Sequence, residues 1–158
     1  MRRKDREMTD RREIVDILGK CDVVRVGLRT PDYPYIVPMN FGYEDDGENL
    51  TIWFHSAHEG RKLDLIRSDS RVGFEADCGH KLLIGDFGCG CSMEYESISG
   101  YGDITICAEK DIESKQRGAK AVMRQYIPDQ EFNFTAEQLA MILVMRLDVK
   151  YFTGKRKK

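Results

Sequence analysis

The stretch PYIVPMNFGYEDDGENLTIWFHSAHEGRKLDLIR, residues 34–67, contains the segments that decide the fold. It reads as two apolar strands around the turn EDDGEN, followed by a polar connection and a short amphipathic helix. Pro38 cannot donate to a sheet ladder, so the first strand is expected at a sheet edge or a bulge. Leu63, Leu65 and Ile66 supply the buried stripe of the helix.

The flanking sequence continues in alternating and helical patterns. Asp10 and Glu13 resemble a capping box, and the apolar residues that follow predict a short helix that ends at Gly19. The further expected elements are a strand at 21–28 that forms a hairpin with 35–43, a strand at 71–77, a long glycine-bent strand within 92–107, a helix over 109–126, a capping box at Thr135 and Gln138, and a last strand within 141–154.

Most of the connections are too short for a parallel crossover, which favours an antiparallel sheet or barrel. We therefore predict a mainly β (α+β) fold of about six strands with short flanking helices. The chain has 158 residues, of which 41% are hydrophobic and 33% charged, as expected for a single domain over residues 1–158. Its basic ends, residues 1–8 and 154–158, are expected to be flexible tails.

Charge and hydropathy exclude several classes of function. The net charge of −2 and the isoelectric point near 6.0 provide no general attraction to nucleic acid or anionic lipid. No apolar run approaches the roughly 18 to 20 residues of a membrane span, and the N-terminus is charged where a signal peptide is apolar. We therefore expect a cytoplasmic protein. Its five cysteines, Cys21, Cys78, Cys89, Cys91 and Cys107, are expected to be reduced thiols.

The connection after the second strand has the composition of a phosphate site. His55 ends the strand, Ser56 follows, and Arg61 and Lys62 begin the helix. A hydroxyl, two cations and the free N–H groups of a helix start are donors that a phosphomonoester requires. An ordinary strand-to-helix turn with solvated cations has the same composition, so both readings stay open here.

The segment around Pro38 is the second candidate. Free main-chain groups beside Val37 and Met39 suit a flat heteroaromatic ring with polar atoms on its rim. The alternative is an edge strand that serves only packing, with Asn40 as a turn or bulge residue.

A third cluster consists of Cys78, His80, Cys89 and Cys91. In extended chain, the spacings C-x-H and C-x-C point neighbouring ligands to opposite faces, which argues against zinc and leaves free thiols as the expectation. We predict no metal site. A catalytic pair of Cys91 with a histidine is conceivable, but no local signal marks an activated thiolate.

The segments VPMNFGY and FHSAHEGRK, at this separation, are similar to those of the FMN-binding split-barrel proteins related to pyridoxamine 5′-phosphate oxidase. The opening helix, the RVGFE strand and the late CSMEYESISGYGDI strand follow in the order of that family. Within the family, the chain resembles the 5-nitroimidazole-resistance (Nim-type) branch. The resemblance implies a six-stranded antiparallel split β-barrel, FMN as cofactor, and a homodimer with the cofactor at the subunit interface.

The resemblance also implies roles for individual residues. Val37, Pro38, Met39 and Asn40 would lie along the isoalloxazine ring through backbone contacts. The ribityl and phosphate end would be held by His55, Ser56, Ala57, Arg61 and Lys62, and the partner chain would contribute Tyr95 and Ser97.

These roles predict an FMN-dependent oxidoreductase that reduces a small acceptor such as a nitro-aromatic or a quinone, with His55 as the catalytic residue. The alternatives are a non-catalytic flavin or haem carrier or sensor, in which His55, His58 or His80 would offer an axial nitrogen, and a dimeric interaction module with a vestigial pocket. The C-terminus contains no recognisable pyridoxal-phosphate-binding motif, which argues against a role in vitamin B6 synthesis.

Overall fold

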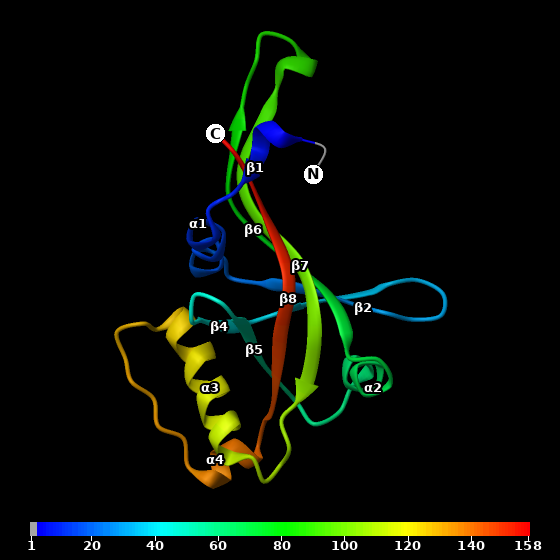
Figure 1. Ribbon diagram of the computed structural model, residues 1–158, viewed down its shortest axis with the longest axis vertical. Coiled ribbons are helices and arrows are strands. Elements are labelled where there is room, and N and C mark those ends of the chain that lie inside the picture. The colour runs from blue at the N-terminus through cyan, green and yellow to red at the C-terminus, as the bar shows by residue number, and fades with distance from the viewer. Residues whose placement is uncertain (1–2) are drawn as a thin grey trace.

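The computed structural model describes residues 3–158 as a curled antiparallel sheet with helices against it (Figure 1). The strands are β1 Glu7–Met8, β2 Val24–Leu28, β3 Tyr35–Met39, β4 Phe41–Asp45, β5 Leu50–Ser56, β6 Arg71–Leu83, β7 Ser92–Ile106 and β8 Leu143–Lys157. The helices are α1 Arg11–Val15, α2 Arg61–Ser68, α3 Ile112–Tyr126 and α4 Ala136–Ala140, with 3₁₀ turns at Lys4–Arg6, Leu18–Lys20 and Gly88–Gly90. Across residues 3–158, no helix is both long enough and apolar enough to span a membrane.

The sheet closes on itself through a bent strand. Its strand order is β3-β2-β6-β7-β8-β5-β4, with β1 paired to β8, and every pair is antiparallel. The two end strands, β3 and β4, are consecutive in the chain and are separated only by Asn40. One bent segment therefore pairs first with β2 and then with β5. Counting it as one strand gives the predicted six; the structure divides it in two and adds the short β1, which makes eight.

The ends of the chain differ from the sequence prediction. Residues 1–2 lie outside the described residues, but β1 pairs Glu7 with Lys155 and Met8 with Gly154. The last strand also continues to Lys157 opposite Tyr95 of β7. Of the predicted tails, residues 7–8 and 154–157 are therefore part of the sheet, because backbone pairing in three strands offsets their polar composition, and residues 4–6 form a 3₁₀ turn.

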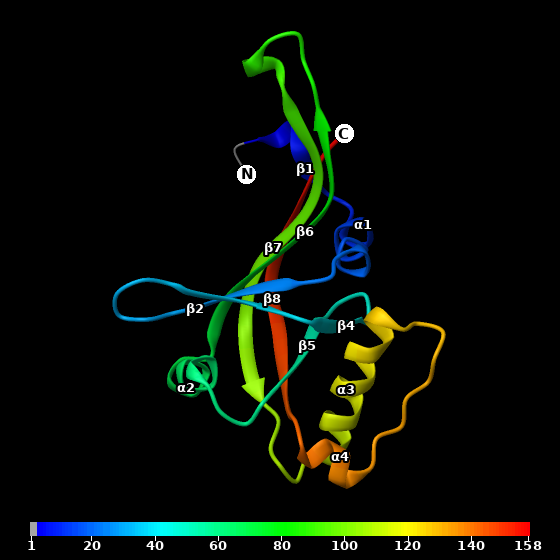
Figure 2. The same cartoon turned by 180° about the vertical axis from the view of Figure 1, so that it is seen from behind.

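The hairpin of β6 and β7 is longer than the sequence predicts. The strand predicted at 71–77 runs on to Leu83, with a register shift between Cys78 and Lys81 that Gly79 accommodates at a φ of 68°. In both views the hairpin projects beyond the barrel, with its tip far from the helices (Figures 1 and 2). The tip is formed by residues 84–91, which include Gly85, Gly88, Gly90, Cys89 and Cys91.

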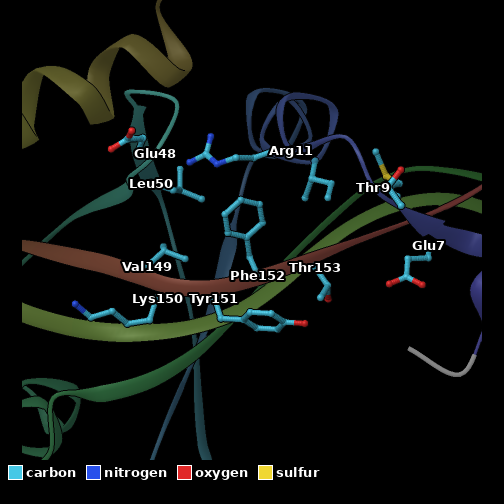
Figure 3. A pocket seen from close by; sticks show the side chains of 12 residues that line it. Glu7, Thr9, Arg11, Glu48, Leu50, Val149, Lys150, Tyr151, Phe152 and Thr153 are labelled. Atoms are coloured by element: carbon cyan, nitrogen blue, oxygen red, sulfur yellow. The ribbon is translucent and has the colours of Figure 1, made fainter.

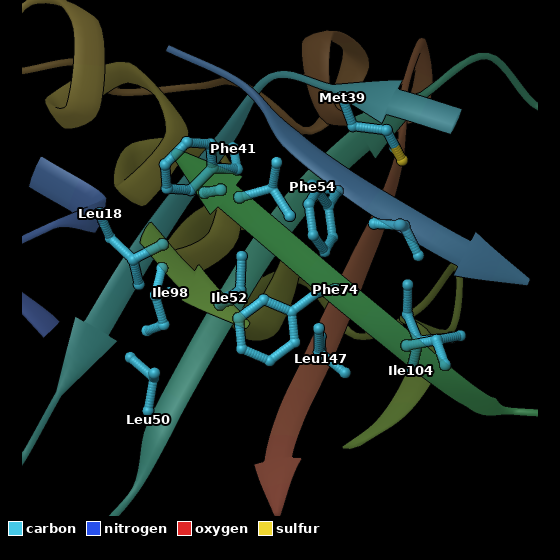
Figure 4. Packing of buried hydrophobic residues seen from close by; sticks show 14 of the residues in the cluster. Leu18, Met39, Phe41, Leu50, Ile52, Phe54, Phe74, Ile98, Ile104 and Leu147 are labelled. Carbon is cyan, nitrogen blue, oxygen red and sulfur yellow. The ribbon is translucent and has the colours of Figure 1, made fainter. Parts of the chain in front are cut away.

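The barrel interior is filled by apolar side chains from its alternating strands (Figure 4). Residues in β2 alternate between buried and more exposed positions, and β5 contributes a nearly continuous buried run. Leu18, Phe41, Ile52, Phe54, Phe74, Ile98, Ile104 and Leu147 are each at most 4% exposed.

Helix α3 packs on the outside of the barrel through glycines. A Cβ at Gly42 would lie 2.2 Å from the backbone carbonyl carbon of Ala121, and one at Gly118 would lie 2.6 Å from Cε3 of Trp53. The two glycines thus let α3 approach β4 and the buried Trp53 closely. This close approach determines the positions of both ends of α3. Each end contributes a residue to one of the sites described below.

Candidate functional site

The end of β5 carries a buried serine hydroxyl that has no hydrogen-bond partner within residues 3–158. Ser56 is opposite Leu143 of β8, and His55 is opposite Val144. Ser56 is 7% exposed, yet its Oγ has no hydrogen-bond partner among residues 3–158. A buried hydroxyl without a partner is costly, so this atom marks a place where a ligand would supply one.

The start of α2, at Arg61, lies five residues beyond Ser56 in the chain and is open to an anion. Gly60 caps the helix at a φ of 139°, a conformation that glycine adopts readily, and it has no side chain to cap the first N–H groups. Arg61 and Lys62 occupy the first turn. An uncapped helix start with two cations attracts negative charge.

A cation–π contact joins this helix start to the first strand of the site. The guanidinium carbon of Arg61 lies 5.0 Å from the centre of the Tyr35 ring in β3. Arg61 is itself exposed. The two predicted halves of the site, residues 35–40 and 55–62, therefore lie side by side.

The segment Val37–Asn40 occupies a sheet edge, as Pro38 predicts. Strand β3 ends the sheet path and pairs only with β2, where Pro38 is opposite Arg25. Pro38 and Asn40 are exposed and Val37 is half-buried, whereas Met39 is 8% exposed and packs in the core. Met39 can therefore meet a ligand only through its backbone.

Tyr126, at the end of α3, holds the bend between β3 and β4. Its hydroxyl donates to the carbonyl of Asp22 at 2.8 Å and accepts from the backbone N–H of Phe41 at 3.0 Å. Asn40 Nδ2 also donates to it at 3.2 Å. Sequence reasoning missed this tyrosine and Tyr35: Tyr126 is 86 residues from Asn40 and no local pattern links the two.

Asn40 and His55 each follow the last pair of the β4–β5 register. That pair joins Phe41 and Phe54, and Asn40 and His55 are their neighbours in the chain. His55 is exposed, as is the following Ala57. Each of the other two histidines has a polar partner at one ring nitrogen: His58 Nε2 lies 2.9 Å from the carbonyl of Ala140, and His80 Nε2 lies 2.6 Å from Asp77 Oδ2.

Tyr95 and Ser97 do not join the other candidate residues within one chain. Both are half-buried on β7 at the base of the projecting hairpin, where Ser97 is opposite Asp77 and Tyr95 is opposite Lys157. Strands β2 and β6 separate β7 from β3. Arg6 Nη1 donates to the Tyr95 hydroxyl at 3.4 Å.

The cysteine and histidine cluster is spread along the hairpin. Cys78 lies at its register shift and Cys89 and Cys91 lie at its tip, so the hairpin separates them. In residues 3–158, no three His, Cys, Asp or Glu side chains gather as ligands for a metal ion.

A cavity of about 460 Å³ lies elsewhere, between the N-terminal segment, the β4–β5 turn and β8 (Figure 3). Two cations line it. Arg11 is paired with Asp45 at 2.6 Å, and its guanidinium carbon lies 5.5 Å from the centre of the Phe152 ring. Lys150 lies 3.9 Å from a carboxylate oxygen of Asp103. Because both cations have a carboxylate partner, the cavity offers little to an anion.

Comparisons with known proteins agree with the predicted fold. The model of the family "Pyridoxamine 5′-phosphate oxidase" matches residues 10–156. A solved structure of a candidate 5-nitroimidazole antibiotic resistance protein from Bacteroides thetaiotaomicron is 32% identical, with a TM-score of 0.80, and the match covers 94% of this chain and 85% of that one. Among curated proteins, no sequence matches this chain.

More distant structures share the fold. An FAD- and haem-binding protein from Mycobacterium smegmatis is 17% identical with a TM-score of 0.81, covering 97% of this chain and 74% of that one. A flavocytochrome from Azotobacter vinelandii is 16% identical with a TM-score of 0.80, covering 100% and 72%. The antiparallel split barrel predicted from the sequence is therefore confirmed.

Proposed function

Since the chain belongs to the pyridoxamine 5′-phosphate oxidase family, we propose that it is an FMN-binding oxidoreductase that uses the site between β3 and the start of α2. The observation that carries the proposal is the unpartnered, buried Oγ of Ser56, followed five residues later in the chain by an uncapped helix start. Oxygen atoms of a flavin phosphate would accept from Ser56, from the first N–H groups of α2, and from Arg61 and Lys62. The residues present fit FMN.

The ring would lie along the edge strand. Val37, Pro38, Met39 and Asn40 would face it through their backbone, because Met39 packs its side chain in the core. Tyr126 would keep the Asn40 bend in place through its hydrogen bonds to Asn40 and Phe41. His55 and Ala57 would lie between this edge and the phosphate.

Bound FMN would supply two-electron redox chemistry, and the protein would set its position and exclude competing reactions. We propose that a nitro-aromatic or a quinone is the acceptor, as the likeness to the candidate 5-nitroimidazole antibiotic resistance protein suggests. His55 is the residue to polarise or protonate it, because it is exposed at the end of β5.

We propose further that the site is completed in a homodimer. Pro38, Asn40 and Arg61 are exposed in the single chain, which leaves one side of the site open. The sheet also exposes apolar side chains that a partner could cover: Ile36 is 64% exposed, and the stacked rings of Tyr101 and Tyr151 are 57% and 53% exposed. Tyr95 and Ser97 would reach the site of the other subunit. A cytoplasmic location belongs to the same proposal.

Haem is the second candidate ligand. Within residues 3–158, His55 is the histidine without a polar partner. Two of the similar structures are an FAD- and haem-binding protein and a flavocytochrome. A haem carrier or sensor would use His55 as an axial ligand.

An absorbance spectrum of the purified protein, before and after addition of FMN, tests the proposal when combined with a mass measurement. We expect flavin bands at one FMN per chain on a dimer. A Soret band without flavin bands would replace FMN by haem. A protein that is colourless when purified, and whose spectrum shows no binding after FMN is added, would contradict the proposed site.

A further inference from the structure

A separate cavity is lined by a lysine whose side chain is buried and forms no ion pair within residues 3–158. It has a volume of about 290 Å³ and lies between the end of β7, the start of α3 and the start of β8. These segments meet at the end of the molecule where α4 lies (Figure 1). Lys115 lines the cavity and is only 3% exposed. This position lies on the buried face of α3, one turn before Gly118 and Ala119.

The neighbouring cations are paired, but Lys115 is not. Arg117 binds Glu44 at 2.7 Å, and Arg146 binds Asp148 at 2.9 Å. In residues 3–158, no carboxylate lies within ion-pair distance of the Lys115 ammonium and no hydrogen bond reaches it. A lysine with a buried side chain is normally paired. Lys115 Nζ is not among the fully enclosed polar atoms without a partner, so the ammonium meets the water-accessible cavity, where it can bind an anionic ligand.

The other polar groups of the cavity do not neutralise this charge. Burial raises the pKa of the Cys107 thiol, which keeps the sulfur neutral. His58 Nε2 is engaged with the Ala140 carbonyl. Glu109 is exposed at the rim, where water screens its charge. Lys115 therefore carries the buried fixed charge of the cavity, and Glu109 carries the exposed one.

The remaining wall is apolar and selects the type of anion. Ile106, Ile142 and Leu143 line it. A phosphate needs donors on several sides, which one ammonium does not supply. The volume equals that of roughly ten waters at about 30 Å³ each, which leaves room for a short carbon chain.

We infer that this cavity binds a short-chain carboxylate, with its carboxylate on the Lys115 ammonium and its carbon chain against Ile106, Ile142 and Leu143. The site is separate from the proposed flavin site: the flavin phosphate would bind Ser56 and α2, whereas this ligand would bind α3. The two proposals can therefore fail independently.

Titration of the full-length protein with butyrate, followed by ¹H–¹⁵N NMR, tests the inference. The backbone amides of Cys107 and Leu143 are expected to shift saturably with butyrate and not with the uncharged butyramide. Lys115→Met keeps the apolar stem and should weaken butyrate binding about tenfold or more, because the charged hydrogen bond is lost. Lys110→Met removes an exposed lysine near the same helix and should bind butyrate as the wild type does.

Three outcomes would overturn the inference. These are no saturable shifts in the wild type, equal butyrate affinity in Lys115→Met, and equal or tighter binding of inorganic phosphate at the same amides. If Lys115→Met fails to fold, Lys115→Gln takes its place and should show the same loss. FMN affinity, measured on the same variants, should be unchanged by Lys115→Met.

Discussion

The guanidinium carbon of Arg61 lies 5.0 Å from the centre of the Tyr35 ring, although the two residues belong to a helix and a strand that do not follow one another. The stacking directs the first cation of α2 toward the sheet edge that carries Pro38 and Asn40. A phosphate at the helix start and a flat ring along the edge would thereby belong to one ligand.

Arg61→Ala should weaken FMN binding by about 10- to 100-fold, because a charged hydrogen bond contributes roughly 1.5–3 kcal/mol. Quenching of flavin fluorescence measures the affinity. The matched control is Arg67→Ala, in the last turn of the same helix, where the arginine contacts only Asp64 among the described residues. Equal losses in the two variants would mean that the net charge of the helix matters and the position does not.

Ser56→Ala should affect the ligand-free and FMN-bound proteins in opposite ways. Without FMN, the variant should be as stable as the wild type or more stable, because it loses a buried hydroxyl without a partner. With FMN, affinity should fall about tenfold. Thermal unfolding with and without FMN measures both effects. A variant that is destabilised without ligand and binds FMN normally would show that the hydroxyl serves the fold.

Tyr126→Phe should destabilise the protein by about 1 kcal/mol, because the backbone N–H of Phe41 loses its partner and the carbonyl of Asp22 keeps only Asn40 Nδ2 at 3.5 Å. Urea unfolding measures the loss. Tyr33→Phe, at a position that is 83% exposed, is the control and should change little. We also expect weaker FMN binding in Tyr126→Phe, since the Asn40 bend is no longer held.

Gly42→Ala should destabilise the protein by about 1–3 kcal/mol or more, because the new Cβ would meet the backbone of Ala121, which cannot rotate away. Gly88→Ala, where nothing lies within 4 Å of the added Cβ, is the control. Far-ultraviolet circular dichroism during urea unfolding compares the two. Equal stability of the two variants would contradict the close packing of α3 on β4.

Glu96 should make stability depend on pH. Its carboxylate accepts from Lys20 at 2.6 Å and from Arg156 at 2.5 Å, and these hydrogen bonds lower its pKa. A lowered folded pKa adds stability that is complete above the unfolded value of about 4.3 and is lost as the pH falls through the folded value. Glu96→Gln should therefore cost about 1 kcal/mol at pH 7 and less below about pH 4. Glu59→Gln, at an exposed position, should show no such difference.

Much of the fold could be predicted because its signals are local. The hairpin of 24–28 with 35–39, the helix after Gly60 and the capping box at Thr135 all follow from short patterns, and Pro38 indicates the sheet edge. The long hairpin arm could not be predicted, because its strands are polar and rich in glycine and are stabilised by cross-strand pairing. The same holds for the paired chain ends.

The candidate site divides in the same way. Ser56, Arg61 and Lys62 are neighbours in sequence, so a phosphate site could be outlined from composition. The contacts of Tyr35 and Tyr126 depend on how a helix and a strand meet across the barrel. The unpaired state of Lys115 is likewise a property of packing, because the sequence around it reads as an ordinary charged helix.

The most direct test of the phosphate site compares FMN with riboflavin, which carries the same ring and ribityl chain without the phosphate. The account predicts that the wild type binds FMN at least about 100-fold more tightly than riboflavin, and that Ser56→Ala and Arg61→Ala lower FMN affinity toward the riboflavin value while leaving riboflavin binding unchanged. Equal affinity for the two flavins in the wild type would contradict a phosphate site at the start of α2.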